Sequence, residues 1–382
     1  MLSQIRLLII AITAIFTFQV NASVLPPPPQ LAATAYVLME AESGEIIASS
    51  GADGQFAPAS LTKMMTSYIV EHELAEGNIG MDDLVPVSVK AWKTEGSRMF
   101  IREGTQVRLE DLLRGVIIQS GNDASVALAE YVAGSEEAFA DLMNQHAERL
   151  GLKNTRFVNA TGLPAEGHYS SPHDLALIGQ ALIQDFPEQY AIYAEKYFTY
   201  NDIKQPNRNR LLWRDPTVDG IKTGHTNEAG FCLVASAVRD DMRLISVVLG
   251  TDSDSARAQE SQKLLAYGFR FYRNYPLYKK GQELNTPKVW KGVVDSVSLG
   301  LNADLSLTIP RGSEDQLAAT LDLPENIQAP INVGDAIGRL IVTLDGEEVA
   351  SEPLVALMTV AEAGFFKTLW HSVVLFFNGL FS

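Results

Sequence analysis

Three short polar strings stand far apart along the chain, and a fold that uses them together has to bring them to one place. They are Ser60-Leu61-Thr62-Lys63, Ser120-Gly121-Asn122 and Lys222-Thr223-Gly224. Each string alone is a weak signal, because short patterns of this kind arise by chance in a chain of 382 residues. Together they supply hydroxyls, two amines and an amide, which are the groups needed to attack an amide bond with a serine. The sequence therefore predicts a domain in which distant segments converge on one pocket.

The first string supplies a nucleophile with a base beside it. The apolar spacing that follows Pro58 and Ala59 predicts a helix beginning near Ser60. Residues three apart share one face of a helix, so Ser60 and Lys63 lie together. A serine hydroxyl hardly ionises at neutral pH and needs a neighbouring group to take its proton. Lys63 can do this if its pKa is lowered by burial or by a second cation, for which Lys222 is the candidate.

The other strings supply the remaining polar groups. Ser120 can relay the proton to a leaving amine, while the Asn122 amide can hold a peptide-like substrate or position Lys63. A helix start at Ser60 also leaves backbone N–H groups that can stabilise an oxyanion. The alternative interpretation involves no chemistry: an N-capping serine with a solvated lysine, an Asn-containing turn, and a strand that begins with Lys-Thr-Gly.

The residues around these strings extend the pattern. The longer matching segments are Ala57 to Met65, Ser120 to Ala124, Asn159 to Pro164 and Asp219 to Thr226. S-x-x-K, S-x-N and K-T-G in this order are the signature of penicillin-binding proteins and serine β-lactamases. With its longer segments, the chain resembles the low-molecular-mass penicillin-binding proteins of the serine-type D-alanyl-D-alanine carboxypeptidase family, from about residue 30 to the C-terminus.

This resemblance implies catalytic roles for five matched residues. Ser60 would form the acyl-enzyme, with Lys63 as its base. Ser120, Asn122 and Lys222 would form the group that relays the proton and holds the substrate.

The resemblance also implies how the substrate is bound. The backbone N–H groups of Ser60 and His225 would form the oxyanion hole, and Thr223, helped by Arg208 or Arg257, would receive the terminal carboxylate of the substrate. The substrate-binding positions are therefore Thr223, Gly224, His225, Arg208 and Arg257.

The implied activity is removal of the last D-alanine from peptidoglycan stem pentapeptides, with β-lactam antibiotics as covalent inhibitors of Ser60. Gly121 stands where many class A β-lactamases have Asp, and no Glu-x-x-Leu-Asn string lies between Ser120 and Lys222. Both departures favour a carboxypeptidase. A β-lactamase, a D,D-endopeptidase of the same fold, and an envelope protein that acts in binding and cell shape stay open as alternatives.

Composition excludes other classes of function. The formal net charge of −16 and a pI near 4.8 argue against a nucleic-acid partner, because phosphate binding requires basic clusters. The six histidines show no close pair with metal-ligand spacing, so we expect neither a metal nor a cofactor. Cys232 is the single cysteine and lies in an apolar run, which predicts a buried, inert thiol.

The first residues predict export. Arg6 precedes the apolar run from Leu7 to Phe18, and small residues follow it, so we expect a signal peptide over residues 1–22. Residues 23–30 contain Pro26 to Pro29 and form a Pro-rich linker. We expect the mature chain at the periplasmic face of the cytoplasmic membrane.

Three further regions differ in pattern. Residues 31–275 carry strand signals at both ends with helical patterns between them, which predicts one mixed α/β domain. The resemblance implies that this domain is of the penicillin-binding-protein and serine β-lactamase type, a mixed sheet with helices. Residues 276–358 consist of short alternating runs, including Val293 to Leu301, and predict a small all-β domain. Residues 359–382 predict an amphipathic helix that lies on a membrane surface. A core helix of the β domain is the alternative for this tail.

Overall fold

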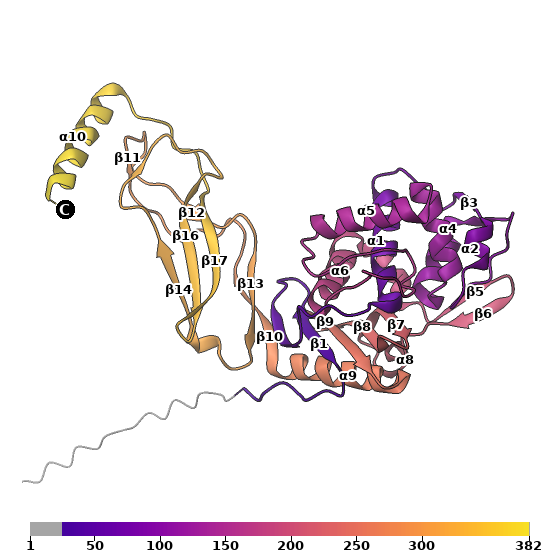
Figure 1. The fold of residues 1–382 in the computed structure, drawn as a ribbon. Helices are drawn as coiled ribbons and strands as arrows, with labels where there is room; N and C mark the ends of the chain where they lie inside the picture. The colour runs from indigo at the N-terminus through magenta and orange to yellow at the C-terminus, as the bar shows by residue number, and fades with distance from the viewer. Residues whose placement is uncertain (1–24, 382) are drawn as a thin grey trace, which may run out of the picture.

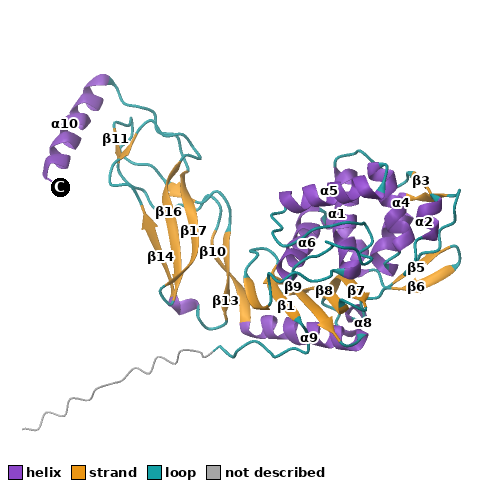
Figure 2. Ribbon diagram, viewed as in Figure 1, coloured by secondary structure: helices purple, strands orange, loops and turns teal. Residues whose placement is uncertain are grey.

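The chain folds into an N-terminal α/β domain, a β domain and a terminal helix, arranged in that order from right to left in Figure 1. The computed structural model describes residues 25–381. The signal peptide that we predict over residues 1–22 lies outside this range. Helices gather in the N-terminal domain, while the β domain consists almost entirely of strands and loops (Figure 2).

A five-stranded sheet forms the centre of the N-terminal domain. Its strand order is β2-β1-β9-β8-β7, and every neighbouring pair is antiparallel. The domain is α/β as predicted, but the sheet itself is not mixed, because tight turns join β1 to β2 and β7 through β9 in succession. The strands are β1 (Ala35–Glu40), β2 (Ile46–Ser50), β7 (Val218–Thr226), β8 (Gly230–Arg239) and β9 (Met242–Thr251). Strand β7 carries the Lys-Thr-Gly string and is an edge strand of the sheet.

Helices cover both faces of this sheet. The first face packs against an apolar cluster built from α1, α4 and α6, and the second packs against α9. The longer helices are α1 (Lys63–Ala75), α4 (Asn122–Ala133), α5 (Glu136–Arg149), α6 (Pro172–Asp185) and α9 (Asp254–Phe271). The shorter segments are a 3₁₀ turn η1 (Ala59–Thr62), β3 (Leu84–Pro86), α2 (Val89–Lys93), β4 (Gln106–Arg108), α3 (Leu109–Arg114), a π turn η2 (Gly115–Gln119), α7 (Pro187–Tyr190), a 3₁₀ turn η3 (Ala191–Ala194), β5 (Tyr197–Tyr200), β6 (Ile203–Pro206) and α8 (Leu211–Arg214).

The β domain begins directly after α9. Strand β10 (Tyr272–Tyr278) leaves the helix and pairs with β13 (Leu305–Pro310). A second sheet has the order β12-β17-β16-β14. The strands are β11 (Val289–Trp290), β12 (Leu299–Gly300), β14 (Leu317–Asp322), β15 (Ile327–Gln328), β16 (Ala336–Leu344) and β17 (Glu347–Ala356), with a 3₁₀ turn η4 (Glu314–Gln316). Alternate residues of β13 are buried, as expected for a strand with one solvated face.

One strand prediction in the β domain is wrong. The alternating run from Val293 to Leu301 forms strand only at Leu299 and Gly300. The segment instead doubles back, since Val289 N–H donates to Asp295 O and Val297 N–H donates to Pro287 O. In this run Val297, Leu299 and Leu301 are buried while Val293 and Val294 are exposed, so the apolar spacing does not correspond to one continuous strand.

The terminal helix α10 (Phe365–Phe381) presents its polar side to the β domain. Lys367 forms an ion pair with Asp295 at 2.8 Å, and His371 Nδ1 accepts a hydrogen bond from Lys291 N–H at 2.7 Å. The apolar side points away, and Phe366 and Trp370 are 87% and 66% exposed. No helix within residues 25–381 combines the length and the apolar character that crossing a bilayer requires.

Candidate active site

Ser60 lies on the η1 turn, against the edge strand β7. Ala59, directly before it, has a φ of 48°, which is rare for a residue with a side chain. Two glycines allow the close packing around this turn. A Cβ atom at Gly162 would lie 1.8 Å from Ala59 O, and one at Gly224 would lie 3.1 Å from both Leu61 Cγ and Pro58 O. The absence of a side chain at Gly224 therefore allows β7 to pack closely against the turn that carries Ser60.

Lys63 begins α1 and is fully buried. Its Nζ lies 3.1 Å from Ser60 Oγ, 2.7 Å from Asn122 Oδ1 and 2.5 Å from the backbone oxygen of Thr161. The predicted pairing of Ser60 with Lys63 on one helical face is thus present in the structure, across the junction between η1 and α1.

This geometry suits a neutral amine. A neutral lysine has two N–H donors and one lone pair. Thr161 O and Asn122 Oδ1 can only accept, so they take the two donors and leave the lone pair for the hydroxyl proton of Ser60. Burial, followed by the positive charge of Arg208, lowers the pKa of Lys63 to about 7, although Asp123 and Glu136 oppose this shift. Our expectation that Lys222 is the second cation is therefore replaced by Arg208.

Thr161 is a site residue that the sequence reasoning does not single out. Its backbone oxygen is aimed by a tight turn in which Asn159 Oδ1 accepts from Thr161 N–H at 3.1 Å and from Gly162 N–H at 2.7 Å. A backbone acceptor is independent of side-chain identity, so the only signal was the Asn-x-Thr-Gly string itself.

Asn122 and Ser120 approach Lys63 from the second string. The Asn122 amide is shared between Lys63 and Glu95 O, to which Nδ2 donates at 2.6 Å, so its role here is to position the lysine. Ser120 has a φ of 66° at the end of η2, and its hydroxyl lines the pocket. Among residues 25–381, the buried Ser120 Oγ has no hydrogen-bond partner. An unpaired buried hydroxyl is costly, and a substrate or a transferred proton would satisfy it.

Lys222 stands apart from this triangle. It is 3% exposed, and its Nζ donates to Thr223 O at 3.2 Å. Burial and then the charges of Lys63 and Arg208 hold the pKa of Lys222 well below its usual value. The charge of Arg208 lowers the pKa of both lysines, so the two amines lie in one electrostatic environment.

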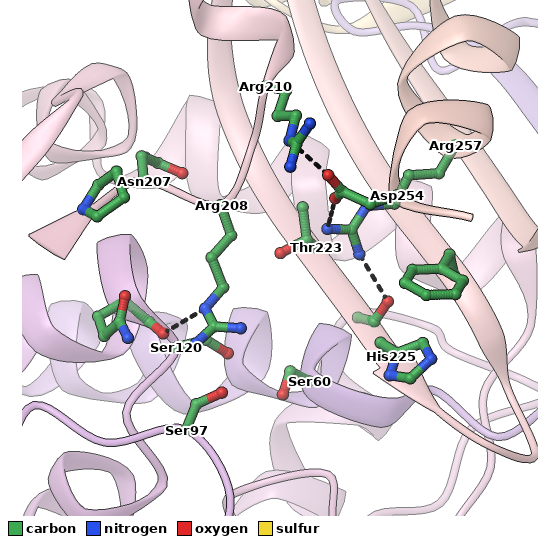
Figure 3. A pocket seen from close by; sticks show the side chains of 14 residues that line it. Ser60, Ser97, Ser120, Asn207, Arg208, Arg210, Thr223, His225, Asp254 and Arg257 are labelled. Carbon is green, nitrogen blue, oxygen red and sulfur yellow. Dashed lines mark hydrogen bonds and ion pairs between the residues drawn. The ribbon is translucent and has the colours of Figure 1, made fainter.

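A hollow of about 580 Å³ opens in front of Ser60 (Figure 3). Ser120 and Arg208 stand on one side of it, and Thr223, His225 and Arg257 on the other. Arg208 Nε donates to Gln119 O at 2.9 Å, the only hydrogen bond of its side chain within the described part of the chain. Arg208 therefore keeps both terminal nitrogens available for a carboxylate.

Arg257 and His225 are engaged with the protein. Arg257 Nη1 donates to Gly224 O at 3.0 Å, and its Nη2 pairs with Asp254. The His225 ring lies 4.0 Å from the Phe231 ring, centre to centre, so this residue can act through its backbone N–H. Within residues 25–381, no cluster of three or more His, Cys, Asp or Glu side chains is placed to hold a metal ion.

A serine hydroxyl in contact with a buried lysine amine, in an α/β domain that is followed by a β domain, is the arrangement of a serine hydrolase. Residues 21–253 match the family model of D-alanyl-D-alanine carboxypeptidases, and residues 272–362 match that of the penicillin-binding protein 5 C-terminal domain. The chain belongs to the D-alanyl-D-alanine carboxypeptidase family. The predicted family and fold class are confirmed.

Individual relatives agree over most of their length. The chain is 47% identical over 361 residues to the D-alanyl-D-alanine carboxypeptidase DacC of Escherichia coli, covering 92% of this chain and 90% of that protein. It is similar to the crystal structure of penicillin-binding protein 5 from Haemophilus influenzae, with a TM-score of 0.85 and 45% identity over 88% of this chain and all of the other. A Listeria monocytogenes penicillin-binding protein D2 structure in an ampicillin-bound form has a TM-score of 0.56 and 30% identity, covering 64% of this chain and all of that one.

Proposed function

We propose that the protein is a serine-type D,D-carboxypeptidase that removes the terminal D-alanine from peptidoglycan stem pentapeptides. The observation that carries this proposal is the set of three contacts of Lys63 Nζ, one of which brings the amine within 3.1 Å of Ser60 Oγ, close enough for proton transfer. Family membership supports the substrate class, and the geometry supports the roles that we propose for the residues.

The substrate carboxylate would be held by Arg208 and Thr223. The guanidinium of Arg208 and the Thr223 hydroxyl line the same hollow as Ser60. A charge-assisted hydrogen bond to a carboxylate is roughly twice as strong as a neutral one, so this contact selects a free C-terminus. The scissile carbonyl would then lie with its oxygen between the N–H groups of Ser60 and His225.

Acylation begins when Ser60 Oγ attacks the carbonyl carbon of the penultimate D-alanine. Lys63 Nζ takes the hydroxyl proton as the C–O bond forms, and the carbonyl oxygen becomes an oxyanion. The C–N bond then breaks. Its nitrogen receives the proton from Lys63 through Ser120, and D-alanine leaves with its amine intact.

Deacylation reverses the roles. Water attacks the Ser60 ester, one proton passes to Lys63, and collapse of the second tetrahedral intermediate returns the hydroxyl to Ser60. A penicillin would acylate the same oxygen by opening its lactam ring. Because the opened ring stays attached, its amine does not diffuse away, and slow hydrolysis makes the drug an inhibitor.

The proposed location of the enzyme rests on the predicted signal peptide and on α10. We propose that the exported chain rests on the periplasmic face of the membrane, with the aromatic side of α10 in the lipid interface. The polar side of this helix contacts the β domain through Lys367 and His371. The aromatic side therefore faces away from the β domain and is free to contact lipid.

Mass spectrometry after incubation with benzylpenicillin tests the activity. We expect one adduct, which peptide mapping assigns to Ser60, together with release of D-alanine from a pentapeptide. An adduct on another residue, or no adduct, would contradict the proposal.

Vesicle sedimentation tests the attachment. Trp370→Asp should reduce binding to phosphatidylethanolamine–phosphatidylglycerol vesicles about tenfold or more, because burying such a ring contributes about 1.5–3 kcal/mol. Val349→Asp is the matched control, since Val349 is an exposed apolar residue on β17. Equal losses in the two variants would exclude α10 as the anchor.

A further inference from the structure

The peptide group between Gly224 and His225 is hydrogen-bonded through its carbonyl oxygen, on the side opposite the N–H. Its N–H is the oxyanion donor that the proposed function assigns to His225, and its carbonyl belongs to Gly224. Arg257 Nη1 donates to that carbonyl at 3.0 Å and to Cys232 O at 3.4 Å. Gly224 and Cys232 are partners across β7 and β8. One guanidinium therefore joins the edge strand to its neighbour at the residue where the donor is needed.

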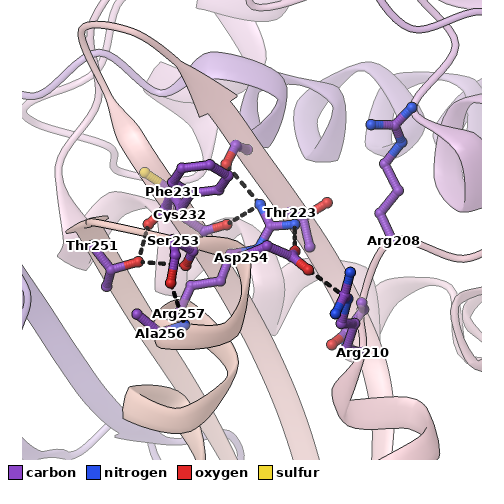
Figure 4. A network of polar contacts seen from close by, with 12 residues as sticks. Arg208, Arg210, Thr223, Phe231, Cys232, Thr251, Ser253, Asp254, Ala256 and Arg257 are labelled. Atoms are coloured by element: carbon purple, nitrogen blue, oxygen red, sulfur yellow. Dashed lines mark hydrogen bonds and ion pairs between the residues drawn. The ribbon is translucent and has the colours of Figure 1, made fainter.

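Asp254 holds that guanidinium in place. It pairs with Arg257 one helical turn later in α9, and its second oxygen lies 2.5 Å from Arg210 Nε. Figure 4 shows the resulting chain of contacts from Arg210 through Asp254 to Arg257. Arg257 is 7% exposed, so its charge depends on this carboxylate for compensation.

The start of α9 is itself fixed to the sheet. Ser253 Oγ accepts from Ala256 N–H at 3.1 Å and caps the helix. Thr251 Oγ1 donates to Phe231 O at 2.9 Å, on β8. The carboxylate of Asp254 is thus placed by a cap and by a strand contact, not by a free loop.

We propose that Asp254 is a positioning residue that, through Arg257, fixes the Gly224–His225 peptide so that its N–H points at the developing oxyanion. Donation to the carbonyl oxygen also polarises the amide, which strengthens its N–H as a donor. This inference rests on the proposed function, because it assigns a support to the oxyanion hole of that reaction.

The different hydrogen-bond partners of Arg208 and Arg257 support this assignment. Both Arg208 and Arg257 line the hollow. The Arg257 guanidinium already donates hydrogen bonds to two backbone oxygens and to Asp254. Arg208 makes one contact, through Nε, within residues 25–381. Arg208 is therefore the better receiver of the substrate carboxylate, and Arg257 the better support for the peptide.

Steady-state kinetics of the full chain with Asp254→Asn tests the inference. We expect kcat for a lysyl-D-alanyl-D-alanine peptide to fall about tenfold with KM within about twofold. The loss should be smaller than the roughly 10²–10³-fold that follows removal of an oxyanion donor, because the N–H stays present but less well fixed. Asp252→Asn, an exposed acid in the same loop, is the matched control and should leave both constants unchanged.

A second substrate separates positioning from carboxylate binding. The acylation rate constant with the C-terminally amidated peptide should fall by the same factor as with the free acid. The double variant Asp254→Asn with Arg257→Lys should lose little more than Arg257→Lys alone, because both act through one contact. A kcat within twofold of the unaltered protein, a change confined to KM, or a loss seen only with the free acid would each overturn the inference.

Failure here is distinguishable from failure of the proposed function. Benzylpenicillin should still form its Ser60 adduct in Asp254→Asn, more slowly. If the unaltered protein formed no Ser60 adduct, the proposed function would be excluded. If Asp254→Asn formed the adduct at the normal rate, only the role of Asp254 would be excluded.

Discussion

The N-terminal domain and the β domain differ in what they bury. The N-terminal domain encloses charged side chains, including Lys63, Asp123, Lys222 and Arg257, whereas the buried polar residue of the described β domain is Ser313. Removing a charge from water costs several kcal/mol unless it is paired and hydrogen-bonded. Buried charged side chains therefore lie in the domain that holds the candidate site, whereas the described β domain buries apolar side chains between hydrogen-bonded strands.

The comparison teaches where function is concentrated. Burial and the charge of Arg208 lower the pKa of Lys63, and burial and the charge of Lys63 lower the pKa of Lys222; such perturbed groups are typical of active sites. The β domain offers no such pair among its described residues. We expect changes in the first region to act on rate and changes in the second to act on stability.

The largest expected effect is the difference between substituting Ser60 in the N-terminal domain and Ser313 in the β domain. Ser60→Ala should lower the rate of D-alanine release at least about 10⁴-fold, because a nucleophile has no substitute. Ser313→Ala, which removes a hydroxyl that donates to Pro310 O at 2.7 Å, should leave the rate unchanged. D-alanine release measured for both variants checks this contrast. Loss of activity in Ser313→Ala would show that the β domain takes part in catalysis.

The next effect concerns the core of the β domain. Leu340 is 1% exposed, so Leu340→Ala should destabilise this domain by about 2–5 kcal/mol through lost burial and a residual cavity. Urea unfolding measures this change. Penicillin acylation at 25 °C should stay the same, and a parallel fall in acylation would mean that the two regions are coupled.

A smaller effect is expected at Arg208. Arg208→Ala should raise KM for peptides with a free C-terminus about 10–100-fold, the equivalent of one charge-assisted hydrogen bond. It should also raise the pKa of Lys63, because the charge of Arg208 lowers it. Kinetics at several pH values measure both changes. A KM that rises equally for amidated peptides would exclude Arg208 as the carboxylate receiver.

The sequence predicts those contacts of the site that follow from the spacing of side chains along one helix. The three-residue spacing of Ser60 and Lys63 is enough to predict their contact, because helical geometry is regular. The family, the fold class and the enzyme class are confirmed by the matches with known carboxypeptidases. The assignments of Ser120, Asn122 and Lys222 stay predictions until variants are measured.

What the sequence does not reveal depends on backbone and on tertiary contact. Thr161 contributes a carbonyl oxygen, which every residue has, so no residue type marks it. The partners of Arg257 lie on β7, β8 and α9, and only the folded sheet brings them together. The run from Val293 was misread as strand because alternation describes burial without specifying a hydrogen-bonded partner.

The central claim is that Ser60 is activated by a neutral Lys63 with a pKa of about 7. Burial lowers this pKa by disfavouring the charged form, so the base is present above pH 7 and is lost as the pH falls below it. The direct measurement is the rate constant of Ser60 acylation by benzylpenicillin from pH 5 to pH 9, for the unaltered protein and for Lys63→Met. We predict a rate that rises about tenfold per pH unit below a midpoint near 7 and then levels off, and a rate about 10²–10⁴-fold lower without this inflection in the variant. A flat profile in the unaltered protein, or the same inflection in Lys63→Met, would contradict the account.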